Sequence, residues 1–307
     1  DREWLLSKSL SVTPAIYNSA QKMEISAVLE PIKDLKIDLT ASREHNRRSE
    51  INFYDNRDNL IGDAPMTTMR GGSFSMTTIA ISSAFESSNA KNGYKSKAFE
   101  KFLANREIIK TRVQNQYNAG AVIPDKGFIK DDNLGIGGAY QNHVQSGAAN
   151  AVNVNSSDVM IPAFLAAYTG GNAKSISLSL IPGLWALLPN WNMTYDGLSK
   201  IPFVKEYAKS VRLSHRYSCF YQIGSYTSYS TWVDAGDGFG FIRDAVSGKP
   251  TPSSPYNMSS VSIIEAFNPL FGAETVLNNS LLFNMKYNTA RTLNLNSSSL
   301  QIVESMD

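Results

Sequence analysis

The side chains that most often carry catalysis are few in this chain and stand far apart. The three histidines are His45, His143 and His215, and none has a carboxylate or a cysteine at a spacing that would build a proton relay. The chain has no Gly-x-Ser-x-Gly, His-Glu-x-x-His, Walker or paired-cysteine motif. A membrane-embedded lipase or protease would need a Ser/His/Asp-type cluster. The sequence therefore predicts a protein that is not an enzyme.

Two glycine-rich stretches give weaker signals for ligand binding. The stretch Gly135–Gly138 resembles part of a dinucleotide turn, but it lacks a convincing strand before it and helix after it, so a flexible loop is favoured. Asp234 and Asp237 stand among glycines and could hold calcium in a mobile loop, although a plain turn is favoured. We therefore expect no cofactor and no metal ion.

The composition points away from an ordinary soluble domain. Of the 307 residues only 18% are charged, against about 25% in a typical soluble domain. Such a deficit fits surfaces that meet lipid or a hydrated lumen, and Ser/Asn-rich secreted β proteins also show it. The net charge of +2 gives no electrostatic case for nucleic acid. The chain starts without a signal peptide and has no run of about 18 apolar residues. If it reaches an outer membrane, we expect an export signal upstream, and the chain is then a piece of a longer polypeptide or a processed product.

The stretch from Val211 to Val233 alternates apolar and small polar residues over about twenty positions, whereas a soluble strand has about five or six. Its odd positions include Tyr217 and the only cysteine, Cys219, which we interpret as a small hydrophobe. Its even positions include Arg212. A strand of this length, apolar on one side and wet on the other, suits a sheet that stands in a membrane with water behind it.

Two hairpins repeat the pattern with a clean period of two. The first joins residues 23–29 to residues 35–41, and the second joins residues 271–277 to residues 281–287 through Asn278-Asn279. Shorter strands are expected at residues 73–81, 176–180, 184–188, 191–195 and 261–265. The charged cluster at residues 43–50 is interpreted as a solvated loop. Residues 202–210 are interpreted as a short helical turn that leads into the long strand.

A helical segment interrupts the strands. Residues 97–117 have helical spacing with Ser96 as an N-cap, and a second helix is expected to start after Ser157 and to end at Gly170-Gly171. The chain thus divides into barrel strands and loops (1–86), a helical and loop insertion (87–173), and further barrel strands and loops (174–307). The predicted fold class is mainly β, a segment of a very large transmembrane antiparallel β-barrel with a small helical insertion.

The alternation assigns side chains to two environments. Membrane-facing side chains are expected at Met23, Ile25, Leu35, Ile37, Leu39, Leu213, Tyr217, Tyr221, Ile223, Leu281, Phe283, Met285 and Tyr287. Lumen-facing side chains are expected at Lys36, Asp38, Arg212, Arg216, Gln222, Asn284, Lys286 and Asn288. About ten strands cannot close a barrel wide enough for a folded protein, so further strands must come from the rest of the polypeptide.

Several short phrases, in a fixed order along the chain, carry a resemblance to one family. They are Leu29-Glu30-Pro31 with Asp34-Leu35-Lys36-Ile37-Asp38-Leu39-Thr40-Ala41, Gly72-Ser73-Phe74-Ser75-Met76-Thr77, Ala98-Phe99 with Asn105-Arg106, Pro189-Asn190-Trp191 with Tyr195-Asp196-Gly197-Leu198, and Asn268-Pro269-Leu270-Phe271-Gly272 with Arg291-Thr292-Leu293. Together they resemble the C-terminal part of the SprA/Sov family of the bacterial type IX secretion system, along the whole chain. Members of that family are much longer than this chain.

The resemblance implies a bacterial outer-membrane translocon that passes folded cargo proteins to the cell surface. It implies as partners the remainder of the same barrel polypeptide, a PorV-type outer-membrane barrel at a lateral opening, a plug protein, secreted cargo proteins with C-terminal targeting domains, and outer-membrane lipid. It implies no catalytic residues. The alternative from the residues alone is a secreted or surface β-sandwich adhesin without a pore, in which the apolar faces pack on each other.

Overall fold

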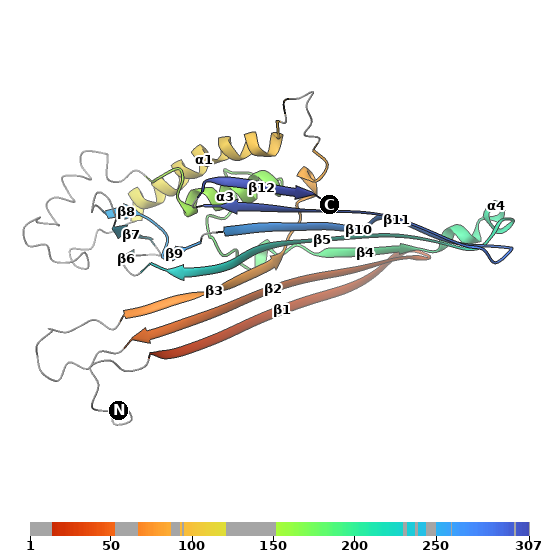
Figure 1. Cartoon of the computed structure of the whole chain (residues 1–307), viewed down its shortest axis with the longest axis horizontal. Coiled ribbons are helices and arrows are strands. Elements are labelled where there is room, and N and C mark those ends of the chain that lie inside the picture. Colours follow the sequence, from red (N-terminus) through yellow and green to blue (C-terminus); the bar gives the residue numbers. More distant parts are fainter. Residues whose placement is uncertain are drawn as a thin grey trace, which may run out of the picture.

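The computed structural model describes residues 14–52, 67–86, 93, 95–120, 152–229, 232–236, 239–243, 250–258, 260–297 and 299–306. Long antiparallel strands dominate it, and they run together toward a narrow end that carries the short helix α4 (Figure 1). The predicted fold class is therefore confirmed at the level of a mainly antiparallel β protein with a small helical part. None of the described helices is long and apolar enough to cross a membrane.

The elements have the following bounds. The strands are β1 (Ala15–Ile32), β2 (Leu35–Asn52), β3 (Thr67–Thr77), β4 (Asn190–Tyr195), β5 (Ala208–Ser228), β6 (Val233–Gly236), β7 (Phe239–Arg243), β8 (Pro250–Pro252), β9 (Tyr256–Asn257), β10 (Ser260–Leu277), β11 (Leu282–Asn296) and β12 (Gln301–Met306). The helices are α1 (Lys97–Gly120), α3 (Ser157–Tyr168) and α4 (Pro202–Lys205), with 3-10 turns η1 (Ile81–Ser83), η3 (Leu184–Ala186) and η4 (Gly197–Lys200).

One nine-stranded sheet contains all the long strands. Its order is β1-β2-β3-β5-β10-β11-β12, and every neighbouring pair is antiparallel. Strands β3 and β4 share the place between β2 and β5: β3 pairs with the end of β2 near Arg43–Asn52, and β4 pairs with the end near Leu35–Thr40. The open edges of this sheet are β1 and β12. A separate small sheet has the order β6-β7-β8.

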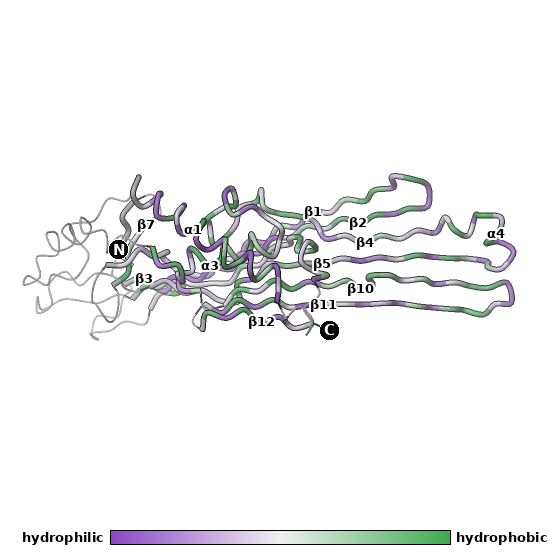
Figure 2. The backbone as a smooth tube through the Cα atoms, turned by 90° about the horizontal axis from the view of Figure 1, so that it is seen from above, coloured by the Kyte–Doolittle hydropathy of each residue, from purple (hydrophilic) through white to green (hydrophobic). Residues whose placement is uncertain are grey.

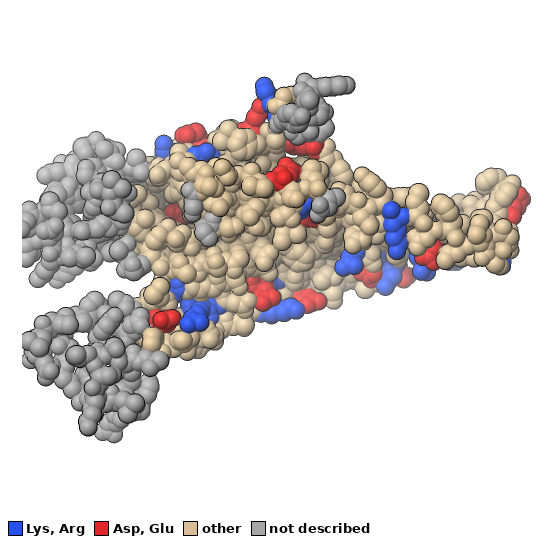
Figure 3. Space-filling model, viewed as in Figure 1, with Lys and Arg blue, Asp and Glu red and all other residues tan. Residues whose placement is uncertain are grey.

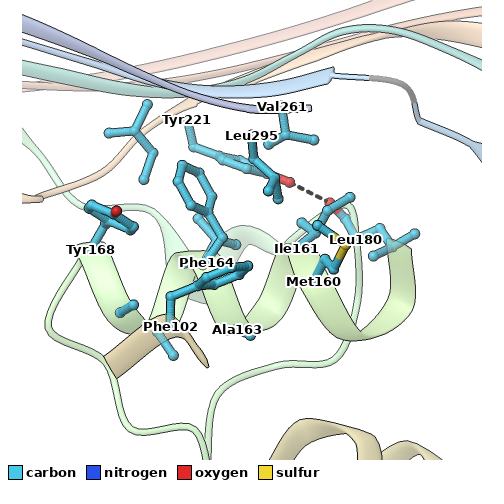
Figure 4. Packing of buried hydrophobic residues seen from close by; sticks show 14 of the residues in the cluster. Phe102, Met160, Ile161, Ala163, Phe164, Tyr168, Leu180, Tyr221, Val261 and Leu295 are labelled. Carbon is cyan, nitrogen blue, oxygen red and sulfur yellow. Dashed lines mark hydrogen bonds between the residues drawn. The ribbon is translucent and has the colours of Figure 1, made fainter. Parts of the chain in front are cut away.

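Helices α1 and α3 form a lobe that covers only one end of the sheet. Figure 2 shows the lobe over one part of the strands and the hairpins continuing beyond it without a second layer. In Figure 4 Tyr221, Val261 and Leu295 of the sheet point toward Phe164 and Ile161 of α3. We call the part of the sheet under the lobe the covered end, and the part beyond it, with β4 and the tips of the β1–β2 and β10–β11 hairpins, the bare end.

Local signals in the sequence explain both helices of the lobe. Helix α1 begins one residue after Ser96, whose Oγ accepts a hydrogen bond of 3.2 Å from the Phe99 amide, so the predicted N-cap is confirmed. Helix α3 begins at Ser157, one residue earlier than predicted, and Gly170 after its end has φ +73°. Nearly every side chain of α3 is buried, because this helix lies between α1 and the sheet.

Three sequence predictions about strands are wrong. The charged cluster at residues 43–50 is not a loop but the second half of β2, held by β1 on one side and β3 on the other. Its charges tolerate a strand because Arg43 and Arg47 point to one face while Glu44, Arg48 and Glu50 point to the other. Residues 176–180 and 184–188 form no strand, since they cross the edge of the lobe in irregular chain with the turn η3.

Candidate functional site: a bare sheet end with two unlike faces

The register of the strands places the predicted apolar residues on a single face. Leu29 lies opposite Ile37, and Ile37 lies opposite Met193. Tyr195 continues the row to Leu213, and Leu213 to Ala273. Because cross-strand partners share a face, the odd positions that the sequence predicts as apolar form one surface across five strands. We call it the apolar face; the lobe covers it at the covered end.

At the bare end the apolar face carries no Asp, Glu, Lys or Arg. Its side chains are Ile25, Ala27, Leu29, Leu35, Ile37, Leu39, Trp191, Met193, Tyr195, Val211, Leu213, His215, Phe271, Ala273, Thr275, Phe283, Met285 and Tyr287. The imidazole of His215 lies with Nδ1 2.7 Å from the carbonyl oxygen of Leu270, so its polar edge is satisfied within the strand layer. By strand pairing, the face therefore contains no Asp, Glu, Lys or Arg from β1 to β11, and Lys209, at the pairing irregularity of β5 between Ala208 and Ser210, is assigned to neither face.

The opposite face of the same strands is charged and hydrated. All eight residues predicted to face a lumen lie on it by register: Lys36, Asp38, Arg212, Arg216, Gln222, Asn284, Lys286 and Asn288. Lys36 Nζ lies 3.0 Å from Asp38 Oδ1, and Arg212 Nε lies 2.9 Å from Asp196 Oδ1. These ion pairs are exposed and add little stability, and their main effect is to keep water on this face.

Large apolar side chains on the bare end are not covered by any part of the chain that the structure describes. The exposed fraction is 53% for Ile25, 56% for Phe283 and 63% for Tyr287. On the surface seen in Figure 3 the charged side chains are scattered and most of the area is uncharged. Contiguous exposed apolar area of this kind marks a surface that meets lipid or a protein.

Three of the predicted membrane-facing residues are buried instead. Tyr217, Tyr221 and Ile223 are at most 1% exposed because α1, α3 and the chain between Ala173 and Ile181 cover this part of β5. Tyr221 donates a hydrogen bond of 3.0 Å to the carbonyl oxygen of Leu180, which ties the strand to that cover. The apolar face was assigned correctly for these residues, but their expected environment was wrong.

A buried polar cluster joins the sheet to the lobe, and the sequence analysis missed it. Arg291 donates from Nε to Glu265 Oε2 at 2.6 Å, from Nη1 to the Ser83 carbonyl at 2.7 Å and from Nη2 to the Ala80 carbonyl at 3.0 Å. Tyr217 donates to Glu265 Oε1 at 2.5 Å and accepts from the Ala80 amide at 2.8 Å. The signal in the sequence is a pair of opposite charges at apolar positions of two neighbouring strands.

The groups in and near this cluster are not activated for chemistry. Burial and the Glu265 carboxylate raise the pKa of the Cys219 thiol to about 12, so the reactive thiolate is not formed at neutral pH. Burial raises the pKa of the Tyr217 phenol still further from its ordinary value. Every hydrogen-bonding group of Arg291 and Glu265 is directed at protein, which describes a structural clamp between sheet and lobe.

The other candidate residues are not brought together. His45 is buried on β2 with Nε2 2.7 Å from the Tyr226 hydroxyl, and burial followed by the charges of Arg47 and Arg43 lowers its pKa. His143, Asp237 and Gly135–Gly138 lie outside the described residues, and for Asp234 only the backbone of β6 is described. The described residues contain no group of His, Cys, Asp and Glu that could hold a metal ion.

One cavity lies inside the lobe. Its volume is about 290 Å³, and Tyr117, Asp158, Leu180 and Tyr256 line it. Burial raises the pKa of the Asp158 carboxyl to about 6, although hydrogen bonds with Ser254 act in the opposite direction. Asp158 is the only carboxyl group among the residues that line this cavity, so the cavity does not contain a catalytic pair of carboxyl groups.

Comparisons with known proteins add no assignment. The sequence matches no family model, and no curated protein is significantly similar to it.

Proposed function

We propose that this chain forms part of the barrel wall of a bacterial outer-membrane translocon that exports folded cargo proteins to the cell surface, as the resemblance to the SprA/Sov family of the type IX secretion system implies. One observation carries the proposal: among the bare-end residues that the strand pairing assigns to a face, every Asp, Glu, Lys and Arg lies on one face of the sheet and none lies on the other. A sheet between lipid and water has this distribution.

The length of the uncovered strand is close to that of one membrane crossing. The eight residues from Leu281 to Asn288 are all exposed and span about 26 Å along the strand at about 3.3 Å per residue. A tilted transmembrane strand crosses the apolar band of the membrane in about 9–11 residues. The strands continue beyond this band into the covered end, where the lobe takes the place of lipid over the apolar face.

The opposite face suits the lumen of a wide channel. Its Lys, Arg, Asn and Gln side chains hold water, and the exposed apolar side chains on this face, such as Val28 and Leu282, stand among them. The strands β1 and β12 are open edges, and an exposed 18-residue edge such as β1 pairs readily with another strand. In the proposal these edges join the remainder of the barrel polypeptide, which widens the barrel enough for folded cargo.

Site-specific labelling in the full polypeptide tests the membrane position. Nitroxides at Leu213 and Phe283 are expected to be accessible to oxygen dissolved in the bilayer, and nitroxides at Arg212 and Asn284 to a water-soluble nickel chelate. The four sites alternate along two strands, so Arg212 and Asn284 are matched controls for their neighbours. Equal exposure of all four sites to the water-soluble chelate would overturn the membrane position and favour the adhesin.

Crosslinking during export tests the channel itself. A photoreactive amino acid at Asn288 is expected to capture a cargo protein with a C-terminal targeting domain during transit, and the same group at Tyr287, on the opposite face, is not. Capture at both positions or at neither would contradict a lumen on the charged face.

A further inference from the structure

A groove on the apolar face, at the covered end of β1, β2 and β3, is lined by cations and aromatic rings. Its volume is about 430 Å³, and its lining includes Tyr17, Gln21, Arg47, Arg70, Tyr226 and Tyr256. A second cavity of about 360 Å³ shares Arg70 and Tyr256 with it and continues toward Trp232. The two together form a groove between the first three strands and the chain that follows β5.

The positive charge in this groove is not compensated on its own face. By register, Arg43, Arg47 and Arg70 point to the same side as the groove, and no Asp or Glu of β1, β2 or β3 does so within the described residues. Arg47 donates to the amide oxygen of Gln21 at 2.6 Å, and Arg70 has no carboxylate within ion-pair distance in the described part of the chain. The acids of this region lie behind, as in the Arg48–Glu50 pair.

Two residues beside the groove position the Tyr226 side chain that lines it. Gly72 lies opposite Arg47, and a Cβ there would lie 2.8 Å from the Tyr226 hydroxyl, so the absence of a side chain lets Tyr226 lie across the strand. The Nε2 atom of His45, whose pKa burial lowers, lies 2.7 Å from the same hydroxyl. Guanidinium groups above hydroxyl and amide groups match the geometry of phosphate oxygens.

The position of the groove beside the uncovered apolar face distinguishes a lipid from a soluble anion. Gln21 stands four residues before Ile25 on β1, which is about 13 Å along a strand. The headgroup layer extends roughly 5–8 Å beyond the hydrocarbon on each side of a bilayer, and the long arginine side chains reach across the rest. Arg43, with its guanidinium carbon 4.8 Å from the centre of the Phe74 ring, stands between the two surfaces.

We infer that this groove binds the phosphate groups of an anionic lipid headgroup whose acyl chains lie on the apolar face of the bare end. Arg47 and Arg70 contact the phosphates, while Tyr17 and Gln21 supply further hydrogen bonds. The inference rests on the proposed membrane position, and it adds a lipid class to it: lipids whose phosphate groups give the headgroup a net negative charge, rather than zwitterionic phospholipids.

Binding of defined lipids tests the inference. The full polypeptide in dodecylmaltoside micelles is titrated with bis-phosphorylated lipid A and with phosphatidylcholine, and binding is read by native mass spectrometry. Lipid A is expected to bind at least tenfold more tightly than phosphatidylcholine. The double variant Arg47→Gln with Arg70→Gln is expected to bind lipid A about thirtyfold more weakly. The matched double variant Lys97→Gln with Lys101→Gln on α1 is expected to keep the wild-type affinity for lipid A.

The outcomes separate this inference from the proposed function. The lipid-site inference is overturned if lipid A binds the wild type and the Arg47/Arg70 variant with equal affinity. It is also overturned if inorganic pyrophosphate binds as tightly as lipid A, or if a glutamate-rich peptide displaces the lipid. If a nitroxide at Phe283 lies in lipid but the protein binds lipid A no more tightly than phosphatidylcholine, the proposed headgroup site is refuted while the proposed barrel wall is supported. If Phe283 lies in water, both fail together.

Discussion

Single substitutions to arginine at successive apolar-face positions along β11 test whether the apolar face of the bare end meets lipid. Leu281, Phe283, Met285 and Tyr287 follow one another on that face, and Leu281 and Met285 are 58% and 46% exposed. In a barrel wall the middle of the row lies near the centre of the bilayer and Leu281 lies near its edge. An arginine is expected to destabilise the protein by about 2–4 kcal/mol at Met285 and by about 0–1 kcal/mol at Leu281.

The opposite result is expected if this end stands in water. Because these side chains are already exposed, an arginine at any of them would change stability by no more than about 0.5 kcal/mol. Asn284→Arg provides the matched control, since it adds the same group one residue away on the charged face. It is expected to be neutral in either environment.

The assay is guanidinium unfolding of the full polypeptide from phospholipid vesicles, followed by tryptophan fluorescence and compared between variants at equal lipid. The loss in free energy of unfolding is expected to be largest for arginine at Met285, smaller at Phe283 and smallest at Leu281. A flat profile within about 0.5 kcal/mol, or a loss at Asn284 as large as that at Met285, would refute the reasoning from the two faces.

Three further predictions concern the covered end. Arg291→Met leaves the buried Glu265 carboxylate without its partner, so we expect a loss of about 3–5 kcal/mol, measured as faster proteolysis of the lobe. Gly72→Ala is expected to cost about 1–3 kcal/mol by the same assay, because the new Cβ overlaps the Asn46 carbonyl and presses on Tyr226. Asp158 has its pKa raised from 3.8 to about 6, so the folded state holds that proton more tightly and stability falls by about 3 kcal/mol as pH rises through this range. In the Asp158→Asn variant this loss of stability with rising pH is expected to be absent, as measured by amide hydrogen exchange of α3.

The controls for these variants follow from their mechanisms. Glu265→Leu combined with Arg291→Met removes both buried charges and is expected to recover much of the stability, whereas equal losses in the single and double variants would argue against a coupled pair. Gly224→Ala provides the control for Gly72→Ala, because a Cβ at Gly224 would meet no atom within 4 Å, and this variant is expected to leave the proteolysis rate unchanged. A pH profile of α3 exchange that is the same with aspartate and asparagine would contradict the assigned role of burial at Asp158.

Much of the sheet could be predicted from a period of two in the sequence. The hairpin at residues 271–287 is confirmed by the pairing of β10 with β11. The short helical turn before the long strand is confirmed as α4, and the long strand itself as β5. Alternation was sufficient because each of these strands keeps one apolar face along its length, so the register that pairs their apolar faces is strongly favoured.

The end of the long strand shows where alternation fails. The sequence places Tyr229 and Val233 on the apolar side, in step with Ile223. In the structure the pairing of β3 with β5 shifts between Phe74 and Gly72, and Tyr226, an even-numbered residue, becomes the buried side chain. A bulge adds one residue to one strand and exchanges the faces beyond it, and no regular pattern announces its position.

The same limit explains the three buried residues that were expected in lipid. A period of two identifies the face of Tyr217, Tyr221 and Ile223, but it cannot say what covers that face, because lipid and a protein core both exclude charge. The buried pair of Glu265 and Arg291 was the available clue. A charge pair at apolar positions indicates a protein environment, where hydrogen-bond donors and acceptors of the backbone can satisfy both groups.

The unusual length of the strands has a physical reason in this division. A strand of 18 or 21 residues is far longer than an ordinary core needs, and here its two ends meet two different covers. The change occurs along β2, where the uncharged positions Leu35, Ile37 and Leu39 give way to Arg43 and Arg47 on the same face. In the proposed barrel wall this change marks the depth at which hydrocarbon ends. The double variant Leu39→Arg with Arg43→Leu then keeps the composition constant but places a charge inside the apolar band that faces the hydrocarbon. Outer-membrane assembly, measured as the folded fraction in isolated membranes, is then expected to fall, and normal assembly would contradict the boundary.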